Sequence, residues 1–298
     1  MLKYILKRIR AKWQVLLMLV PFFALFFLFT VYPVCRSIFY SFTNYDVFSP
    51  PQFIGFKNYV TLFSDDPIFV KAFGNTIVFA VVTGPIGYLL SLIVAWFIND
   101  CGRKMRWILT FVFYAPALSG SAITIFTYLF SADRHGLINS MLINIGIINE
   151  PVAWFKNPVY MLGTVMVVQL WMSLGTGFLA FVAGLQGISK SLYEAGAVDG
   201  IKNKWQEMWF ITLPSLRPQL MFGAVMQITS SFAVSDICMN LCGFPSVEYA
   251  AETIVTHLKD YGLVRFEFGY ASAIATVLFA IMIITNEIVQ FLLRRVGE

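Results

Sequence analysis

Long apolar runs separated by short polar stretches are the dominant pattern of the chain. A transmembrane helix needs about 20 mostly apolar residues. The segments that meet this requirement cover about residues 13–36, 74–98, 107–130, 158–186, 215–237 and 268–293. The first run is longer than the apolar core of a signal peptide and ends at Val31-Tyr32-Pro33, so we expect an uncleaved span. The pattern predicts an all-α membrane protein with six transmembrane helices in a single domain over residues 1–298.

The composition also indicates that the chain is surrounded by the lipid bilayer. The 298 residues are 58% hydrophobic and only 12% charged, whereas soluble domains average about 25% charged residues. The net charge of +5 comes from basic residues near helix ends. The sequence has no basic stripe interleaved with aromatic residues, which is the pattern that indicates a nucleic-acid site. We therefore expect membrane lipid around the chain and no nucleic-acid partner.

The distribution of basic residues predicts the orientation of the spans. Cytoplasmic segments of membrane proteins carry an excess of Lys and Arg. With both termini inside, 14 of the 21 basic residues are cytoplasmic and 7 lie in outer loops. The cytoplasmic ones are Lys3, Lys7, Arg8, Arg10, Lys12, Arg103, Lys104, Arg106, Lys190, Lys202, Lys204, Arg217, Arg294 and Arg295. The prediction is N-in and C-in, with outer loops at 36–73, 131–157 and 238–267.

The cytoplasmic stretch 188–218 begins with the pattern of a soluble-type helix. Ser191 and Glu194 have the spacing of a capping box, in which each residue satisfies a backbone N–H of the other. Small residues follow, and they leave room for another protein's backbone. Gly200 then stands where a left-handed helix stop is expected.

A second, amphipathic piece follows in the same stretch. Trp205, Met208 and Trp209 recur at i, i+3 and i+4, which places them on one helical face. Leu213-Pro214 should end this piece, because proline removes a helical hydrogen bond. From the residues alone, the stretch is explained equally well as a helical hairpin at the membrane surface or as a docking element.

Three short motifs in this stretch carry a resemblance to a known family. Glu194-Ala195-Gly196, Asp199-Gly200 and Ile211-Thr212-Leu213-Pro214 resemble the E-A-A…D-G…I-x-L-P signature of ABC importer permeases. In that family the segment forms a coupling helix that docks into a cleft on the ATPase subunit. The implied coupling residues are Leu192, Tyr193, Glu194, Ala195, Gly196, Asp199, Gly200, Leu213 and Pro214.

Two departures from the signature lead to structural expectations. Gly196 replaces the usual alanine and should loosen the helix slightly. The distance from Gly200 to Pro214 is one residue longer than usual, which predicts a bulge after Gly200.

Other segments resemble sugar permeases of the maltose type, in the expected order along nearly the whole chain. They are 53–59 with Gly74-Asn75-Thr76, then Gly136-Leu137-Ile138-Asn139, Ala183-Gly184-Leu185-Gln186 and Gly269-Tyr270-Ala271-Ser272-Ala273. One departure is Gly243-Phe244-Pro245, where that subfamily has G-G-P.

The resemblance implies a permease subunit that moves a sugar or oligosaccharide into the cytoplasm across a bacterial inner (plasma) membrane. The implied partners are a second homologous permease, two ATPase subunits and an extracytoplasmic solute-binding protein. We expect no enzymatic activity and no cofactor on this chain, with ATP and Mg on the ATPase subunits. Gly187-Ile188-Ser189-Lys190-Ser191 lacks the glycine directly before the lysine that a phosphate-binding loop needs.

Polar and aromatic residues of the fourth and fifth predicted spans are candidates for the substrate path, because hydrogen-bonding groups and aromatic faces suit a sugar. They are Gln169, Trp171, Ser173, Thr176, Gln227, Ser230, Ser231 and Phe232. Ordinary helix packing accounts for such residues as well. The resemblance favours Trp171 as a residue that stacks on sugar and Ser230 as a polar contact.

The alternative function is an ion-coupled secondary carrier for a small polar solute. Such a carrier needs charged side chains deep in the membrane, but Asp236 and Glu287 both lie near the ends of their spans. His135 and His257 fall on outer loops, where we expect solvated side chains and no metal site. Cys238 and Cys242 are four residues apart; we favour unpaired thiols, with a disulfide as the alternative.

Overall fold

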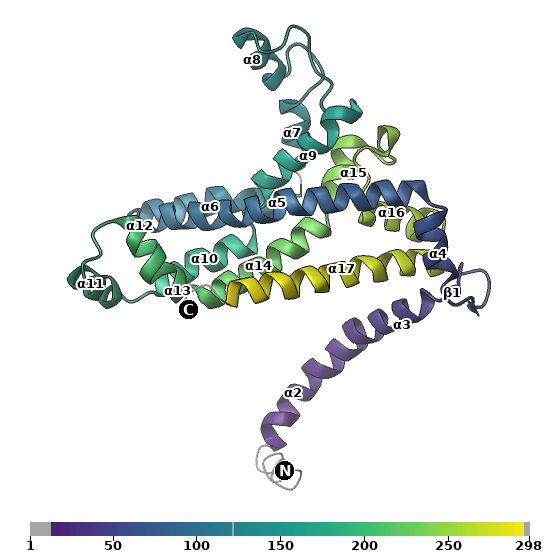
Figure 1. The fold of residues 1–298 in the computed structure, drawn as a ribbon, viewed down its shortest axis with the longest axis horizontal. Helices are drawn as coiled ribbons and strands as arrows, with labels where there is room; N and C mark the ends of the chain where they lie inside the picture. The colour runs from purple at the N-terminus through teal and green to yellow at the C-terminus, as the bar shows by residue number, and fades with distance from the viewer. Residues whose placement is uncertain (1–12, 121, 295–298) are drawn as a thin grey trace. The chain divides into compact units, whose positions relative to one another are not determined.

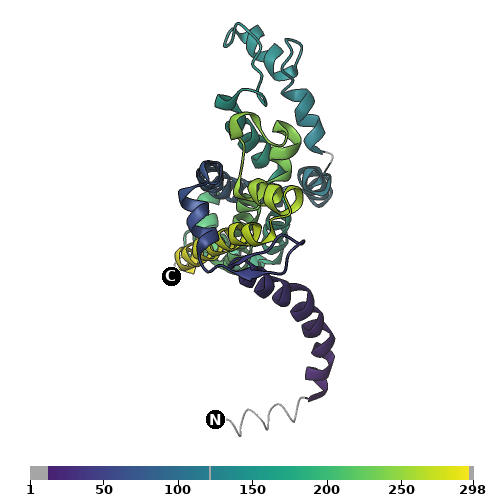
Figure 2. The same ribbon diagram turned by 90° about the vertical axis from the view of Figure 1, so that its right-hand side faces the viewer.

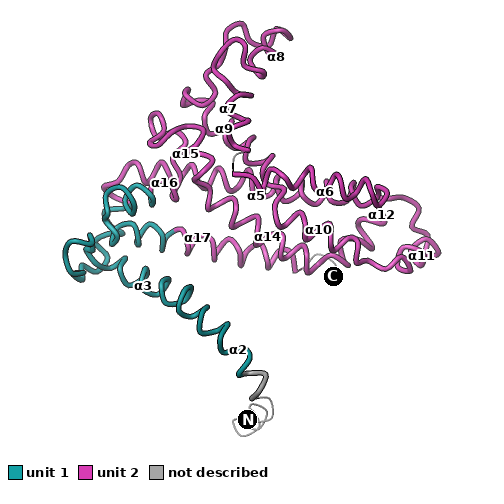
Figure 3. Tube along the Cα trace, turned by 180° about the vertical axis from the view of Figure 1, so that it is seen from behind, with its two compact units in different colours: residues 1–62, 258–277 teal, residues 63–257, 278–298 magenta. Residues whose placement is uncertain are grey.

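The computed structural model describes residues 13–120 and 122–294 (Figure 1). Lys3, Lys7, Arg8, Arg10, Lys12 and Arg295, which contribute to the predicted orientation, lie outside the described residues. The chain forms two compact units, one of residues 1–62 with 258–277 and one of 63–257 with 278–298 (Figure 3). The prediction of one transmembrane domain stays a prediction.

The first unit contains the N-terminal span and a small hairpin. Its elements are α2 (Trp13–Phe26), the π-helix η1 (Phe27–Val31), α3 (Tyr32–Tyr40), β1 (Thr43–Asn44), β2 (Gln52–Phe53), most of α4 (Lys57–Ser64), the π-helix η4 (Asp260–Val264) and the start of α17 (Phe268–Arg294). The strands are antiparallel, with Thr43 opposite Phe53. The Asn58 amide donates to the carbonyls of Ser41 at 2.9 Å and Thr43 at 3.0 Å, which fixes the hairpin.

The second unit is a helical bundle with a loop segment at each end. Its elements are α5 (Pro67–Asn99), α6 (Arg103–Leu118), α7 (Ala122–Leu129), α8 (Leu137–Ile145), α9 (Pro158–Met172), α10 (Thr176–Gly187), α11 (Lys190–Val198), α12 (Lys204–Glu207), η2 (Met208–Thr212), α13 (Leu213–Ser215), α14 (Arg217–Phe232), α15 (Asp236–Cys242), η3 (Val247–Tyr249), most of α16 (Ile254–Lys259) and the end of α17. Helices α5, α10 and α14 pack on one another, and Figure 2 looks along α5 and α6, which appear end on.

Each predicted span has a counterpart, but the third is not a straight helix. The helices long and apolar enough to cross a membrane are Leu17–Tyr40, Pro67–Asn99, Pro158–Gly187, Arg217–Cys242 and Phe268–Arg294. The third predicted span corresponds to α6 and α7, which are bent by 87° relative to each other. Pro116 near the end of α6 and Gly120 just beyond it both disfavour a continuous helix. The apolar pattern alone does not reveal the bend between α6 and α7, so the sequence suggested one continuous span.

Two apolar clusters form the core of the second unit, with a polar layer between them along the helices. One cluster joins Leu92, Trp96, Phe178, Phe181, Leu216 and Leu220 with their neighbours. The other joins Phe79, Val165, Val168, Val234, Ile237 and Cys238 with theirs. On each of the three packed segments, polar residues such as Thr83, Gln169 and Gln227 lie in sequence between members of the two clusters and are themselves buried. Cys238 and Cys242 are both free thiols.

Candidate substrate cavity and coupling segment

Two spans of the second unit are interrupted in the polar layer. The helix α9 ends at Met172, and α10 begins only at Thr176, with a tight turn in which the Gly175 N–H donates to the Ser173 carbonyl at 2.8 Å. Likewise α14 ends at Phe232 and α15 begins at Asp236. Interrupted membrane helices expose backbone groups and are tolerated where they line a cavity or are buried in protein. The breaks therefore mark a place for polar contact inside the bundle.

A cavity of about 300 Å³ lies between these breaks. It is lined by Ala117, Gln169, Met172, Ser173, Gly175, Thr176, Gly177, Met226, Gln227, Ser230 and Ile237. The structure thus brings together five of the predicted path residues, namely Gln169, Ser173, Thr176, Gln227 and Ser230. None of the described residues that line the cavity is charged.

The other three predicted path residues lie elsewhere. Ser231 and Phe232 are buried and line an apolar groove of about 610 Å³ between α5, α14 and α17. Trp171 does not line the cavity, and 61% of its surface is exposed. Its stacking role stays a prediction. The sequence grouped these residues by span, but a helix turns its side chains to different sides within one turn.

Hydrogen bonds across helices hold the polar wall of the cavity in place. The Gln169 amide donates to the Ser230 hydroxyl at 3.2 Å, and the Gln227 amide donates to the Thr83 carbonyl on α5 at 3.1 Å. The first turn of α10 adds backbone N–H groups, since its N-cap, Gly175, has no side chain to satisfy them. The wall therefore offers neutral donors and acceptors, the groups that pair with hydroxyls.

The predicted coupling helix exists as α11, but its cap differs from the prediction. The N-cap is Ser189, whose hydroxyl accepts from the Ser191 N–H at 3.3 Å. The predicted capping box of Ser191 and Glu194 is therefore wrong, because the helix starts two residues earlier and both side chains lie inside it. Glu194 is exposed and makes no hydrogen bond or ion pair with any described residue.

The end of α11 confirms the predicted stop at Gly200. Gly200 has φ of +95°, a conformation open to glycine and costly for other residues. The Gly200 N–H donates to the Ala197 carbonyl at 3.3 Å, and the Ile201 N–H donates to the Gly196 carbonyl at 2.9 Å. This pair of bonds is a Schellman motif, which satisfies the last carbonyls of the helix.

The small residues of α11 do not all face outward. Gly196 is buried, and a Cβ there would lie 2.5 Å from Cδ1 of Ile211. Tyr193 also faces the chain itself, since its hydroxyl pairs with that of Thr212 at 3.0 Å. Gly196 thus faces the chain itself, where the lack of a side chain permits close packing on Ile211. Its role in coupling to an ATPase subunit stays a prediction. The exposed side of α11 includes Leu192, 48% exposed, and Val198, 88% exposed.

The amphipathic piece after Gly200 contains the predicted irregularity, but at a later position. A π-helical turn spans Met208–Thr212, and such turns take one extra residue into a helix. The prediction that Leu213-Pro214 ends the helix is wrong, since α13 continues through Pro214 to Ser215. The wide turn just before Pro214 relieves the clash that the ring otherwise makes with the preceding turn. Met208 is buried, whereas Trp205 and Trp209 are 71% and 70% exposed.

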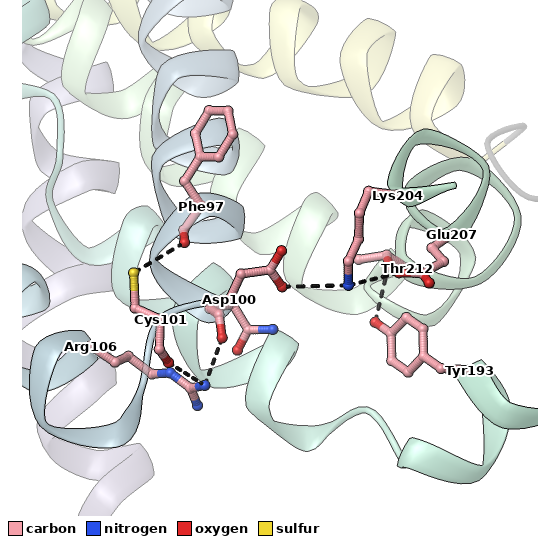
Figure 4. Close-up of polar contacts among 9 residues, drawn as sticks. Phe97, Asp100, Cys101, Arg106, Tyr193, Lys204, Glu207 and Thr212 are labelled. Carbon is pink, nitrogen blue, oxygen red and sulfur yellow. Dashed lines mark hydrogen bonds and ion pairs between the residues drawn. The ribbon is translucent and has the colours of Figure 1, made fainter. Parts of the chain in front are cut away.

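Polar contacts fasten this piece to the end of α5 (Figure 4). Lys204 lies 3.0 Å from Glu207 and 3.8 Å from Asp100. The hydrogen bond to Glu207 raises the pKa of Lys204, with a smaller contribution from Asp100. The Arg106 guanidinium donates to the carbonyls of Asn99 at 2.6 Å and Cys101 at 3.2 Å, which caps α5. The sequence reasoning missed Asp100 and Arg106 because they are far from the signature along the chain, and it used Lys204 only for the orientation of the spans.

At the opposite end of α5, residues 246–257 form a segment that we call the outer loop, which is buried over residues 250–254 and at residues 256 and 257. His257 is 3% exposed and pairs with Asp66, with 2.9 Å between Nε2 and Oδ2. The prediction of a solvated His257 is therefore wrong, whereas His135 is exposed as expected. The Asn75 amide donates to the carbonyls of Ala250 at 3.2 Å and Glu252 at 2.9 Å.

Further bonds connect the outer loop to the cavity region. The Ile254 N–H donates to the Thr76 hydroxyl at 2.9 Å. The Thr253 hydroxyl donates to the Val234 carbonyl at 2.8 Å, at the break between α14 and α15. The motif Gly74-Asn75-Thr76, which the sequence singled out without a role, is thus the attachment point of this loop.

Comparison with known proteins places this geometry in a family. Residues 69–298 match the model of the binding-protein-dependent transport system inner membrane component. The chain belongs to this family. The permease is 31% identical to the probable ABC transporter permease protein YesP of Bacillus subtilis (strain 168), over 88% of this chain and 84% of that protein. It is 30% identical to the lactose transport system permease protein LacF of Rhizobium radiobacter, over 92% of each chain.

Another relative is the sulfoquinovosyl glycerol transport system permease protein SmoG of Agrobacterium fabrum (strain C58 / ATCC 33970), 32% identical over 89% of the permease and 85% of that protein. In fold, the permease is similar to a chain of the bacterial alginate ABC transporter in complex with alginate pentasaccharide-bound periplasmic protein. The TM-score is 0.78 at 23% identity, with 98% of each chain covered. The predicted family and the all-α permease fold are confirmed. The chain is a multi-pass membrane protein of a transport family.

Proposed function

We propose that this chain is the permease subunit of an ATP-driven importer that moves a neutral sugar or oligosaccharide into the cytoplasm. The observation that carries the proposal is the uncharged polar cavity where two interrupted spans meet. A neutral sugar offers many hydroxyls and no charge, so amide and hydroxyl groups can replace its water shell. Relatives that transport lactose and arabinooligosaccharides support this substrate class.

The proposed assembly is a pair of permeases, two ATPase subunits and an extracytoplasmic solute-binding protein in a bacterial inner membrane. The exposed side of α11 is the proposed contact with an ATPase subunit, with Leu192, Glu194, Ala195 and Asp199 available on the surface. The alginate transporter was solved with a periplasmic protein, which supports a binding-protein partner. ATP and Mg belong to the ATPase subunits in this proposal, and the permease performs no chemical reaction.

The structure suggests how a motion at α11 reaches the cavity. The segment α11–α13 contacts the end of α5 through Lys204 and Asp100, and α5 forms part of the polar layer through Thr83. ATP-driven closure of the ATPase dimer draws the two coupling helices together. The packed helices then move as units, because close-packed interiors shift between discrete arrangements rather than deform.

Uptake into cells that express the whole importer tests the proposal. The probes are radiolabelled lactose and a radiolabelled arabinooligosaccharide, each supplied with the cognate binding protein. We expect uptake of at least one probe to stop when ATP is depleted and to continue when an ionophore collapses the ion gradients. Uptake that survives ATP depletion and fails with the ionophore would establish the ion-coupled carrier instead.

Labelling of single cysteines tests the predicted orientation. Phe48 and Val198 are 87% and 88% exposed, so Phe48→Cys and Val198→Cys offer accessible thiols in segments assigned to opposite sides. In a chain whose four native cysteines, including the exposed Cys35, are replaced by serine, we expect an impermeant maleimide added to whole cells to label the Phe48→Cys chain and not the Val198→Cys chain. Labelling of both chains under these conditions would contradict the N-in, C-in topology.

A further inference from the structure

Gly87 on α5 lies directly against two residues of the cavity wall, Gln227 and Ser173. It is buried, and a Cβ at this position would lie 2.5 Å from Nε2 of Gln227 and 3.0 Å from Oγ of Ser173. Real Cβ atoms do not approach other atoms to 2.5 Å, so any other residue here displaces the Gln227 amide. Gly87 itself does not line the cavity, and no motif in the sequence singled it out.

Gln227 separates two different spaces. Among the described residues, it is the one that lines both the polar cavity of about 300 Å³ and the apolar groove of about 610 Å³. Its side chain is almost fully buried, at 8% exposure, and one hydrogen bond to the Thr83 carbonyl holds it. The orientation of this amide therefore decides where the polar wall ends and the apolar surface begins.

We propose that Gly87 is a positioning residue for the transport site: by carrying no side chain, it allows Gln227 to bond Thr83 and to close the polar cavity toward the groove. The inference rests on the proposed function in taking this cavity as the substrate path. It adds that selectivity depends on an α5 residue that never contacts the substrate.

The geometry predicts what Gly87→Ala does. The atom nearest the new methyl group, Nε2 of Gln227, is the far end of a flexible side chain, so the Gln227 amide turns away from Thr83. Oγ and Cβ of Ser173 lie at 3.0 and 3.1 Å and need to give only by a few tenths of an ångström. On the groove side an amide meets mostly apolar side chains, and burial without a hydrogen-bond partner is costly. On the cavity side it meets Gln169, Ser173 and Ser230. The amide therefore moves into the cavity and narrows it.

Gly84 provides a matched control on the same helix. It lies one turn before Gly87, and a Cβ there would be 3.5 Å from Oγ of Ser231, an ordinary contact distance. Gly84→Ala therefore makes the same chemical change in the same helix without moving Gln227. Gln227→Asn provides the rescue, since it keeps the amide and shortens the side chain by one methylene group.

The test measures access to the cavity without needing the identity of the substrate. The introduced thiol comes from Ser230→Cys, because Ser230 lines the cavity and is exposed. The full chain is expressed with its partner subunits in membranes, and the reaction rate with a methanethiosulfonate ethylammonium reagent is measured. The rate of the same chain without Ser230→Cys is subtracted, which removes the contribution of the native cysteines.

We expect Gly87→Ala to lower this rate by about tenfold, Gly84→Ala to change it by less than about twofold, and Gly87→Ala with Gln227→Asn to restore it. Equal rates in the two alanine variants, or no restoration by Gln227→Asn, would overturn the proposal. If Gly87→Ala fails to assemble, assembly of the double variant decides: recovery supports the overlap with Gln227, and continued failure refutes it. Sugar uptake is scored separately, so the expected labelling pattern without uptake of any probe would count against the proposed function alone.

Discussion

The two ends of the second unit are built in opposite ways. The coupling segment, α11 to α13, exposes most of its residues and is fastened to the bundle by a few surface contacts such as Lys204 with Asp100 at 3.8 Å. The second half of the outer loop is buried, with Glu252, Thr253, Thr256 and His257 at 3% exposure or less. A surface ion pair contributes about 0–1 kcal/mol, whereas an unsatisfied buried group costs more.

This difference suggests that the two ends of the second unit have different functions. An element that docks on another protein needs an exposed apolar side and freedom to move with its partner. The outer loop instead bonds both α5 and the break before α15, and so it holds the cavity wall in a fixed position. The comparison predicts that substitutions in the outer loop act on stability, and that substitutions in the coupling segment act on the partner interaction.

The largest effect is expected for His257→Leu. The substitution leaves the buried carboxylate of Asp66 without this partner, and breaking a buried pair costs about 3 kcal/mol or more. The measurement is the midpoint of thermal unfolding of the purified complex in detergent. The control is His135→Leu, since His135 is exposed. Equal midpoints for the two variants would show that the outer loop is not the stable end.

Asn75→Ala is expected to have the next largest effect. It removes the amide that donates to the carbonyls of Ala250 and Glu252, at a cost of about 1–3 kcal/mol. Gly74→Ala is the control, because nothing lies within 4 Å of a Cβ at that position. Proteolysis of the outer loop in native membranes should become faster in the first variant only. Unchanged cleavage after Asn75→Ala would remove the attachment role of the motif.

Gly200→Val is expected to act mainly on the partner. The residue has φ of +95°, and a left-handed conformation costs other residues about 1–2 kcal/mol. The loss is local, so the spans should insert normally while co-purification of the ATPase subunit falls. Gly200→Asn, which tolerates this conformation better, should retain more ATPase. Full co-purification and normal sugar-stimulated ATP hydrolysis in the valine variant would reduce this segment to a surface hairpin.

Glu194→Gln is expected to have the smallest effect on stability. Glu194 is exposed and bonds to no described residue, so the unfolding midpoint should change by an amount equivalent to less than about 0.5 kcal/mol. Any defect should appear only in ATP hydrolysis stimulated by the binding protein. A clear drop in the unfolding midpoint would mean that Glu194 supports α11 itself, and the contrast between the two ends would weaken.

The sequence by itself determined the features that depend on neighbouring residues. Apolar runs located the spans, because membrane insertion depends on local apolarity over about 20 residues. Gly200 marked the end of α11, because a helix stop needs a left-handed residue just beyond the last turn. The resemblance of a few motifs then indicated the family, which the match over residues 69–298 confirmed.

Only the tertiary structure determined which residues distant in the sequence are in contact. His257 and Asp66 are 191 residues apart in sequence, and Gln227 and Thr83 are 144 apart. No local pattern brings such partners together, so the sequence suggested a solvated loop residue at His257 and did not single out Gly87. Helix rotation divided the predicted path residues between a polar cavity and an apolar groove. The start of α11 is a local matter that the sequence reasoning misplaced: the Ser189 hydroxyl accepts from the Ser191 N–H, so the helix begins two residues before the expected cap.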